Sequence, residues 1–283
     1  MPDVELLQPV PLTHAIHGDA PGIPLVLVAG TGYPGRTWPP QLVERLAQAR
    51  PVITFDHRGT GSTGGTPDPY STRLFAADLA ALLERIDLGP AHVLGHSMGG
   101  RVAQWLALDR PDLVASLILA ASGSGQFGAN RQTDGIPIGT ALALAERGYE
   151  AYMRGQITRS FFTAEFAAAH QDRVDWLVAA FWDGRPSLED YLKHVAARQA
   201  HRTTERLTEI DRRTLVLIGD ADTHAGGTGS HWDQSQYLAS AINGAELHVV
   251  AGAKHGIFWS HPDETAAVLE AWTARTDPTV ANG

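Results

Sequence analysis

The sequence predicts an α/β fold: a mostly parallel, doubly wound sheet with helices on both faces and one inserted helical segment. Two observations predict the sheet. Short apolar runs alternate with helical patterns, and each apolar run is continuous, as in strands buried on both faces. A third observation, a single long interruption of that alternation, predicts the insertion. The chain of 283 residues is long enough for one large α/β domain or two smaller ones.

Six apolar runs are predicted as strands. They cover residues 25–28, 52–55, 92–94, 117–120, 214–218 and 247–250. Apolar residues at helical spacing predict helices between them, over residues 42–49, 72–86, 102–108 and 265–274. Alternation of this kind implies parallel strands that are joined by crossover helices.

Between residues 122 and 208 the pattern is helical only. Four helices are predicted there, over residues 140–147, 161–170, 174–182 and 188–199. The simplest interpretation is a helical insertion between two strands of one sheet.

Composition excludes several classes of protein. The chain contains no cysteine, which excludes a disulfide scaffold, a thiolate metal site and a cysteine nucleophile. Its formal net charge of −9 argues against binding to nucleic acid or to anionic membranes. No apolar run approaches the roughly 20 residues that span a bilayer, and the N-terminus does not match a secretory signal. We therefore expect a cytoplasmic enzyme, a monomer or small homo-oligomer, that acts on a small molecule.

The first glycine-rich loop matches the dinucleotide-binding pattern G-x-G-x-x-G. Gly30-Thr31-Gly32-Tyr33-Pro34-Gly35 follows a predicted strand, and Asp56 closes the next one. That pattern requires a helix to begin within the glycines. Pro34 and the run Trp38-Pro39-Pro40 delay the helix until about Gln41, so we expect no cofactor. Two interpretations of this loop remain: it is a tight turn and nothing more, or it helps to bind an oxyanion.

A candidate nucleophile lies in Gly95-His96-Ser97-Met98-Gly99, which matches G-x-S-x-G. A predicted strand precedes it and a predicted helix follows it. Such a strand–serine–helix turn holds the serine in a strained conformation at the strand's carboxyl end. A serine hydroxyl needs a base to take its proton, and the base needs an orienting acid.

Both groups follow later strands, in the order that this geometry requires. Gly219-Asp220-Ala221-Asp222 follows one strand, and Gly252-Ala253-Lys254-His255 follows the last. Asp220, Asp222, His224 and His231 could also suggest a metal site. Their spacing matches no common ligand motif, and we expect no metal.

These motifs resemble the α/β-hydrolase family, in its lid-bearing, esterase- and lactonase-like branch. The resemblance runs from about residue 25 to residue 272 and includes Asp56-His57-Arg58-Gly59-Thr60-Gly61-Ser62-Thr63, similar to the family's D-x-R-G-x-G-x-S loop. It implies Ser97 as nucleophile, His255 as general base and Asp222 as the acid that orients it, with Asp220 as a competitor for that role. It also implies a core domain of residues 1–122 and 207–283, and a helical cap of residues 123–206.

The resemblance further implies an oxyanion hole made of the backbone N–H groups of Met98 and Thr31, with Gly32 as a fallback. Ala29 stands where the family pattern has histidine, which leaves the anchoring of this loop open. The expected reaction is cleavage of a carboxylic ester or lactone through an acyl-enzyme. Alternatives are carbon–carbon bond hydrolysis or cofactor-free perhydrolysis by the same triad, and a ligand receptor with vestigial hydrolysis.

Overall fold

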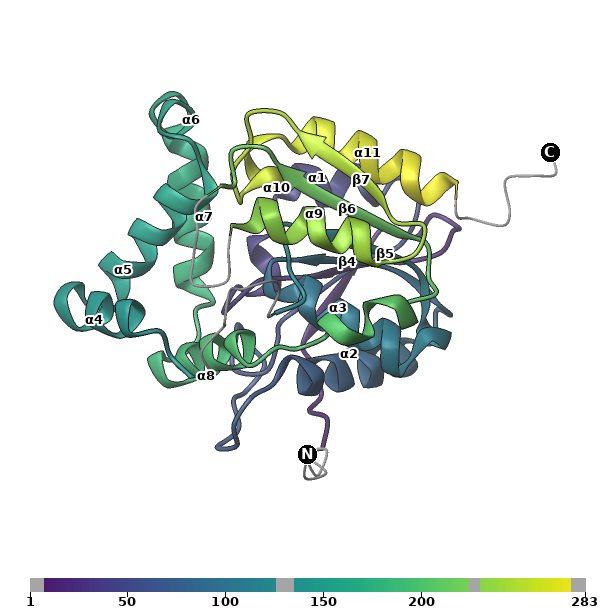
Figure 1. The fold of residues 1–283 in the computed structure, drawn as a ribbon, viewed down its shortest axis with the longest axis horizontal. Helices are drawn as coiled ribbons and strands as arrows, with labels where there is room; N and C mark the ends of the chain where they lie inside the picture. The colour runs from purple at the N-terminus through teal and green to yellow at the C-terminus, as the bar shows by residue number, and fades with distance from the viewer. Residues whose placement is uncertain (1–7, 126–134, 224–229, 276–283) are drawn as a thin grey trace.

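The computed structural model describes residues 8–125, 135–223 and 230–275. Within these ranges seven strands form one sheet in the order β1-β3-β2-β4-β5-β6-β7 (Figure 1). The strands are β1 (His14–His17), β2 (Leu25–Val28), β3 (Val52–Phe55), β4 (Ala91–His96), β5 (Val114–Ala120), β6 (Thr214–Gly219) and β7 (Glu246–Val250). All neighbouring pairs are parallel except β1 with β3, which is antiparallel.

All six predicted strands are confirmed, and the sheet is mostly parallel with one inserted helical segment, as predicted. β1 was not predicted. It is a four-residue edge strand whose first three residues are exposed, so its sequence shows neither a continuous nor an alternating apolar pattern.

Two layers of helices cover the sheet because alternate side chains of each strand point to opposite faces. Leu25 and Leu27 of β2 pack in one core, and Val26 and Val28 in the other. Helices α1 (Pro40–Leu46) and α11 (Pro262–Ala274) contribute to the first core. Helices α2 (Thr72–Ile86), α3 (Met98–Asp109) and α9 (His231–Ala241) contribute to the second.

Helix α2 illustrates how local sequence sets these boundaries. Its predicted limits are confirmed. At its start the hydroxyl of Ser71 accepts a hydrogen bond of 3.0 Å from the N–H of Leu74, and at its end Asp87 adopts a left-handed conformation. Helix α9 was not predicted. It begins at His231, a residue that the sequence suggests only as a possible metal ligand.

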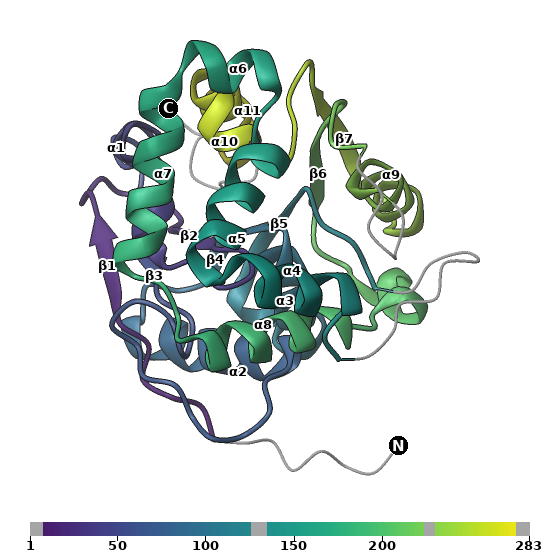
Figure 2. The ribbon, with the colours of Figure 1, turned by 90° about the vertical axis from the view of Figure 1, so that its left-hand side faces the viewer.

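Among the described residues, five α-helices, one π turn and a short 3-10 helix (Thr204–Glu209) lie between β5 and β6 along the chain. We call the five α-helices and the π turn the inserted helices. They are α4 (Ile138–Arg147), α5 (Tyr149–Gln156), the π turn η3 (Ile157–Phe161), α6 (Ala164–Ala169), α7 (Gln171–Asp183) and α8 (Leu188–Gln199). Figures 1 and 2 show that they gather at one end of the sheet. Their apolar side chains join the core that contains α1 and α11.

The predicted helix over residues 161–170 is wrong at its start. The backbone of Phe162 is extended, with φ −124° and ψ 150°, and Thr163 then caps α6 through its hydroxyl. The limits of α8 agree with the prediction, whereas α5 and the π turn were not predicted. No described helix is long and apolar enough to cross a membrane.

Candidate active site

Ser97 occupies a sharp turn between β4 and α3. Its backbone has φ 56° and ψ −118°, a conformation that is costly for a residue with a side chain. Glycines make the turn possible. A Cβ on Gly95 would lie 2.3 Å from the carbonyl oxygen of Gly99, and one on Gly99 would lie 2.0 Å from that of Val28. The predicted strand–serine–helix turn is therefore present.

Two hydrogen bonds hold Ser97 in this conformation. Its N–H donates to the carbonyl oxygen of Ala120 at 2.9 Å, which extends the pairing of β4 with β5. Its own carbonyl oxygen accepts a bond of 2.7 Å from the hydroxyl of Ser122. These contacts tie the turn to the strand that precedes the inserted helices.

Asp222 and His255, which are predicted as the orienting acid and the general base, contact each other. The distance from Nδ1 of His255 to Oδ2 of Asp222 is 2.8 Å, and both residues are buried. Asp220 makes a different contact, because its Oδ1 accepts the N–H of Gly252 at 2.7 Å. The structure thus distinguishes the two aspartates: Asp222 contacts the histidine, and Asp220 shapes the loop that carries it.

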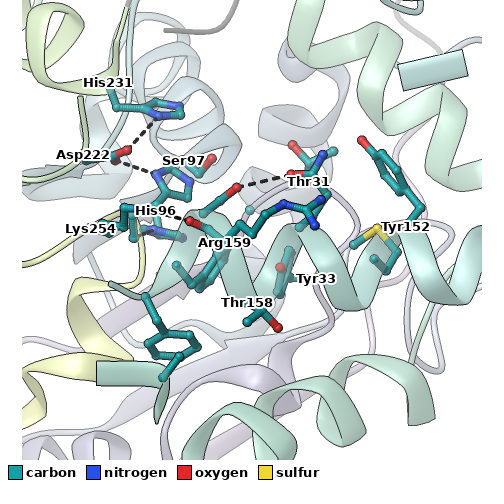
Figure 3. A pocket seen from close by; sticks show the side chains of 18 of the residues that line it. Thr31, Tyr33, His96, Ser97, Tyr152, Thr158, Arg159, Asp222, His231 and Lys254 are labelled. Atoms are coloured by element: carbon teal, nitrogen blue, oxygen red, sulfur yellow. Dashed lines mark hydrogen bonds and ion pairs between the residues drawn. The ribbon is translucent and has the colours of Figure 1, made fainter. Parts of the chain in front are cut away.

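A second histidine contacts the same carboxylate. Nδ1 of His231 lies 3.4 Å from Oδ1 of Asp222, and its ring centroid is 4.2 Å from that of His255 (Figure 3). Burial opposes ionisation of Asp222, but the adjacent His255 and His231 hold the pKa of its carboxyl well below the usual range. Burial and the nearby His255 lower the pKa of His231, against the opposing effect of Asp222.

Asp222, His231 and His255 could also hold a cation, since one ligand atom from each lies within 4.8 Å of the others. Their grouping is equally that of an ionised carboxylate between two imidazoles. His224, the other histidine of the possible metal site in the sequence, lies outside the described residues.

The first glycine-rich loop does not have the geometry of a dinucleotide site. Helix α1 begins at Pro40, as the prolines predict, well after the glycines. Asp56 would have to bind a ribose, but its carboxylate accepts the N–H groups of Gly35 at 2.8 Å and Ser62 at 2.9 Å. The loop instead approaches Ser97, because a Cβ on Gly30 would lie 3.3 Å from the Cβ of Ser97.

Two histidines anchor this loop, although Ala29 replaces the expected one. Nε2 of His57 donates to the carbonyl oxygen of Ala29 at 3.2 Å. Nδ1 of His194, on α8, accepts the N–H of Gly32 at 3.4 Å, and its Nε2 donates to the carbonyl oxygen of Arg58 at 2.9 Å. The inserted helices therefore supply an anchor that no motif in the sequence revealed.

These groups open onto a cavity of about 760 Å³ between the sheet and the inserted helices. Ser97, His255, Asp222 and Thr31 all line it (Figure 3). Met98 is fully buried behind them and begins α3, so its N–H has no acceptor within the helix. Among described residues, the buried hydroxyl of Thr31 has no hydrogen-bond partner.

Other lining residues could be predicted only in part. Tyr33, in the first glycine-rich loop, lines the cavity, whereas Trp38, Ile257 and Phe258 pack in the core. Cavity residues from the inserted helices were largely missed, because helical spacing does not show which face meets a pocket. They include Tyr152, Met153, Gln156, Thr158, Arg159, Tyr191 and Arg198.

The π turn holds the loop that carries His255. The N–H of His255 donates to the carbonyl oxygen of Ser160 at 3.2 Å, and the N–H of Gly256 donates to that of Phe161 at 3.0 Å. The ammonium group of Lys254 donates to the carbonyl oxygen of Arg159 at 2.8 Å. Three successive carbonyl groups of one helical turn thus position three successive residues of the histidine loop.

The sequence of this chain matches a family model and named relatives over most of its length. The model of the "Alpha/beta hydrolase family" matches residues 25–268. A protein of Pseudomonas syringae pv. syringae, named "Putative carbamate hydrolase RutD", is 31% identical over 240 residues, which cover 84% of this chain and 88% of the relative.

Solved structures show the same fold. The enol-lactonase from Burkholderia xenovorans LB400 superposes with a TM-score of 0.80 at 22% identity and covers 93% of this chain and 96% of its own. Est816, described as an N-acyl homoserine lactone degrading enzyme, superposes with a TM-score of 0.74 at 25% identity and covers 92% of this chain and 96% of its own.

Proposed function

The chain belongs to the alpha/beta hydrolase family, and on that basis we propose that it is a serine hydrolase that cleaves a carboxylic ester or a lactone. Ser97 is the nucleophile, His255 the general base and Asp222 the acid that orients it. The observation that carries this proposal is the 2.8 Å contact between His255 and Asp222 in a cavity that Ser97 also lines.

In the first step, the hydroxyl oxygen of Ser97 attacks the carbonyl carbon while Nε2 of His255 takes its proton. Asp222 holds the ring through Nδ1, which leaves Nε2 to act as the base and stabilises the imidazolium that forms. When the tetrahedral intermediate collapses, His255 returns the proton to the leaving oxygen. With an ester the alcohol departs, whereas with a lactone the freed hydroxyl stays attached to the acyl chain; in both cases Ser97 remains acylated.

In the second step, His255 removes a proton from water, which attacks the acyl carbon. Collapse of this second intermediate breaks the bond to Ser97, and the serine oxygen recovers the proton from His255. The acid product leaves and the enzyme is restored. No cofactor takes part in this sequence.

The developing oxyanion needs two N–H donors, and we assign them to Met98 and Thr31. The position of Met98 at the start of α3 supports the first, since that N–H points out of the helix. Hydrogen bonding supports Thr31 over Gly32, because the N–H of Gly32 donates to His194. The close approach of Gly30 to Ser97 brings this loop within range.

The inserted helices act as the cap in this proposal. They form one wall of the cavity, they anchor the loop of Thr31 through His194, and they hold the loop of His255 through the π turn. Carbamates are a second candidate substrate class, favoured by the name of the relative at 31% identity. Their carbonyl carbon would be attacked by Ser97 in the same way.

Pre-steady-state hydrolysis tests the proposal. Wild-type protein and Ser97→Ala are mixed with 4-nitrophenyl esters of short to medium acyl chains, with simple lactones and with an aryl carbamate, each with and without EDTA. We expect a burst of nitrophenol followed by turnover, unaffected by EDTA and absent from Ser97→Ala. Turnover that persists in Ser97→Ala, or is abolished by EDTA, would contradict the serine mechanism.

If no member of the panel is turned over, ester and lactone cleavage is wrong, and two other reactions of the same triad become the candidates. Carbon–carbon bond hydrolysis is then assayed with a meta-cleavage product, and perhydrolysis with peroxide plus a carboxylic acid.

A further inference from the structure

The wall of the cavity is positively charged, although the chain as a whole is acidic. Arg159, Arg198 and Lys254 line the cavity, and Asp222 is the only carboxylate among the described lining residues. The whole chain carries a formal net charge of −9. Three cations around one cavity of such a protein create a local field opposite in sign to the overall charge.

The carboxylate of Asp222 does not neutralise these cations. It is buried and accepts from His255 at 2.8 Å, with His231 at 3.4 Å on its other oxygen. Among described residues, Arg159 and Lys254 form no ion pair with any carboxylate; the ammonium of Lys254 donates to the backbone oxygen of Arg159. Their charges therefore remain available to a molecule in the cavity.

A further cation lies buried beside this wall. The guanidinium of Arg101, on α3, donates to the carbonyl oxygen of Arg198 at 2.6 Å and faces Oε1 of Gln234 at 3.4 Å. Burial and the positive charges of Arg198 and Arg202 lower the pKa of Arg101 to about 9. A carboxylate that entered the cavity would reduce this repulsion among positive charges, whereas a neutral ligand would not.

We propose that the substrate is an ester or lactone that also carries a carboxylate group, and that Arg159, Lys254 and Arg198 bind this group. The inference rests on the proposed function, because it describes the remainder of the molecule whose carbonyl Ser97 attacks. In Figure 3 the side chain of Arg159 lies between Ser97 and Tyr152. A guanidinium can hold a carboxylate by two parallel N–H bonds, and the volume of about 760 Å³ accommodates several carbons between carbonyl and carboxylate.

Two esters that differ only in charge test this proposal. Mono(4-nitrophenyl) adipate and its methyl ester share chain length and leaving group, but only the first carries a carboxylate. We expect kcat/KM to be at least about tenfold higher for the anion at low ionic strength, an advantage that shrinks as sodium chloride screens the charges. Equal values, or a preference for the methyl ester, would overturn the proposal.

Variants then locate the binding groups. Arg159→Gln combined with Lys254→Gln is expected to lower the anion-to-methyl-ester ratio of kcat/KM by about tenfold, while Lys254→Arg alone preserves it. Arg154→Gln is the matched control, because Arg154 belongs to α5 but is exposed, faces Asp175 at 3.4 Å and does not line the cavity. A ratio that the double variant leaves unchanged, with its melting temperature intact, would contradict the assignment.

Failure of the proposed function is distinguishable from failure of this inference. If wild-type protein cleaves neither ester, the proposed ester hydrolysis fails, and adipate itself is used as the probe in titration calorimetry, with 1,6-hexanediol as the neutral comparison. Adipate binding that the double variant loses would support the anion site independently of catalysis. Absence of adipate binding would overturn the anion site as well.

Discussion

The N–H of Gly32 donates a hydrogen bond of 3.4 Å to Nδ1 of His194, which joins the first glycine-rich loop to helix α8 of the inserted helices. Because Nε2 of the same ring donates to the carbonyl oxygen of Arg58, the ring is held as a neutral tautomer between two loops of the sheet. The loop that carries Thr31 is thus oriented by a residue far away in sequence.

Substitutions at His194 should separate these two contacts. His194→Ala is expected to lower kcat by about ten- to a hundredfold, because the loop that approaches Ser97 loses its anchor. Asparagine can reproduce the acceptor at Nδ1, and glutamine the donor at Nε2. We therefore expect steady-state kinetics to show higher activity for His194→Asn than for His194→Gln. The reverse order would show that the Arg58 contact matters more. Exposed His14 supplies a control, His14→Ala.

The two aspartates after β6 should differ sharply in their effect on catalysis. Ser97→Ala and His255→Ala should each lower kcat by several orders of magnitude, and Asp222→Asn somewhat less. Asp220→Asn should lower kcat by less than about tenfold, because the contact that the described residues give Asp220 is with the N–H of Gly252 and not with His255. Single-turnover kinetics with a 4-nitrophenyl ester would measure this. A larger loss at Asp220 than at Asp222 would refute the assignment of the acid.

His231 should influence the pH dependence of the reaction. In His231→Ala the charge of Asp222 acts on one histidine instead of two, and a positive charge that can form 4.2 Å from the ring of His255 is removed. Both changes alter the electrostatic surroundings of the catalytic pair, so the pH profile of kcat/KM should differ from that of wild type. His231→Asn, which can still donate to Asp222, should restore part of the wild-type profile. Coincident profiles for all three proteins would mean that His231 is only a packing residue.

The hydroxyl of Thr31 should contact the substrate or its transition state. It is buried, lines the cavity and has no partner among described residues. Thr31→Val keeps the shape and the backbone N–H but removes this group, and should lower kcat/KM by about three- to tenfold. Thr31→Ser keeps the hydroxyl and should stay within about twofold of wild type. Equal activity of the valine and serine variants would exclude a hydroxyl contact.

Acid should destabilise the fold below neutral pH. Burial lowers the pKa of His57 to about 3 and that of His194 to about 4, so both are neutral in the folded state and take up protons on unfolding near their ordinary pKa of 6.5. Their contribution to stability is complete above pH 6.5 and is lost as pH falls from there through the folded-state values. At pH 5 each of these two histidines should lower the free energy of unfolding by on the order of 2 kcal/mol relative to its value above pH 6.5.

Urea unfolding at pH 7.5 and pH 5.0 would measure this loss. The glutamine of His194→Gln cannot be protonated in this pH range. This variant should be less stable than wild type at pH 7.5, but its free energy of unfolding should fall by less between pH 7.5 and pH 5.0. Equal losses for the two proteins would assign the acid sensitivity to other groups.

Local patterns predicted the sheet and the catalytic loops because both depend on short-range sequence. A buried parallel strand needs a continuous apolar run, and a strained serine turn needs glycines at fixed offsets, so the strands and the turn at Ser97 could be predicted from the chain alone, whereas the choice of Asp222 over Asp220 came from the family resemblance. β1 was missed because an exposed edge strand is under neither constraint. Contacts such as His194 with Gly32 could not be predicted, since they depend on how the inserted helices pack against the sheet.

The π turn limits how far the inserted helices can be exchanged as a module. Its carbonyl groups at Arg159, Ser160 and Phe161 accept hydrogen bonds from the loop that carries His255. A chimaera that imports all of a relative's helices would replace these acceptors and displace the loop of His255. Grafts that keep η3 (Ile157–Phe161) and recombine the helices on either side leave the base in place, so breakpoints on both sides of this turn are the ones to use for altering substrate range.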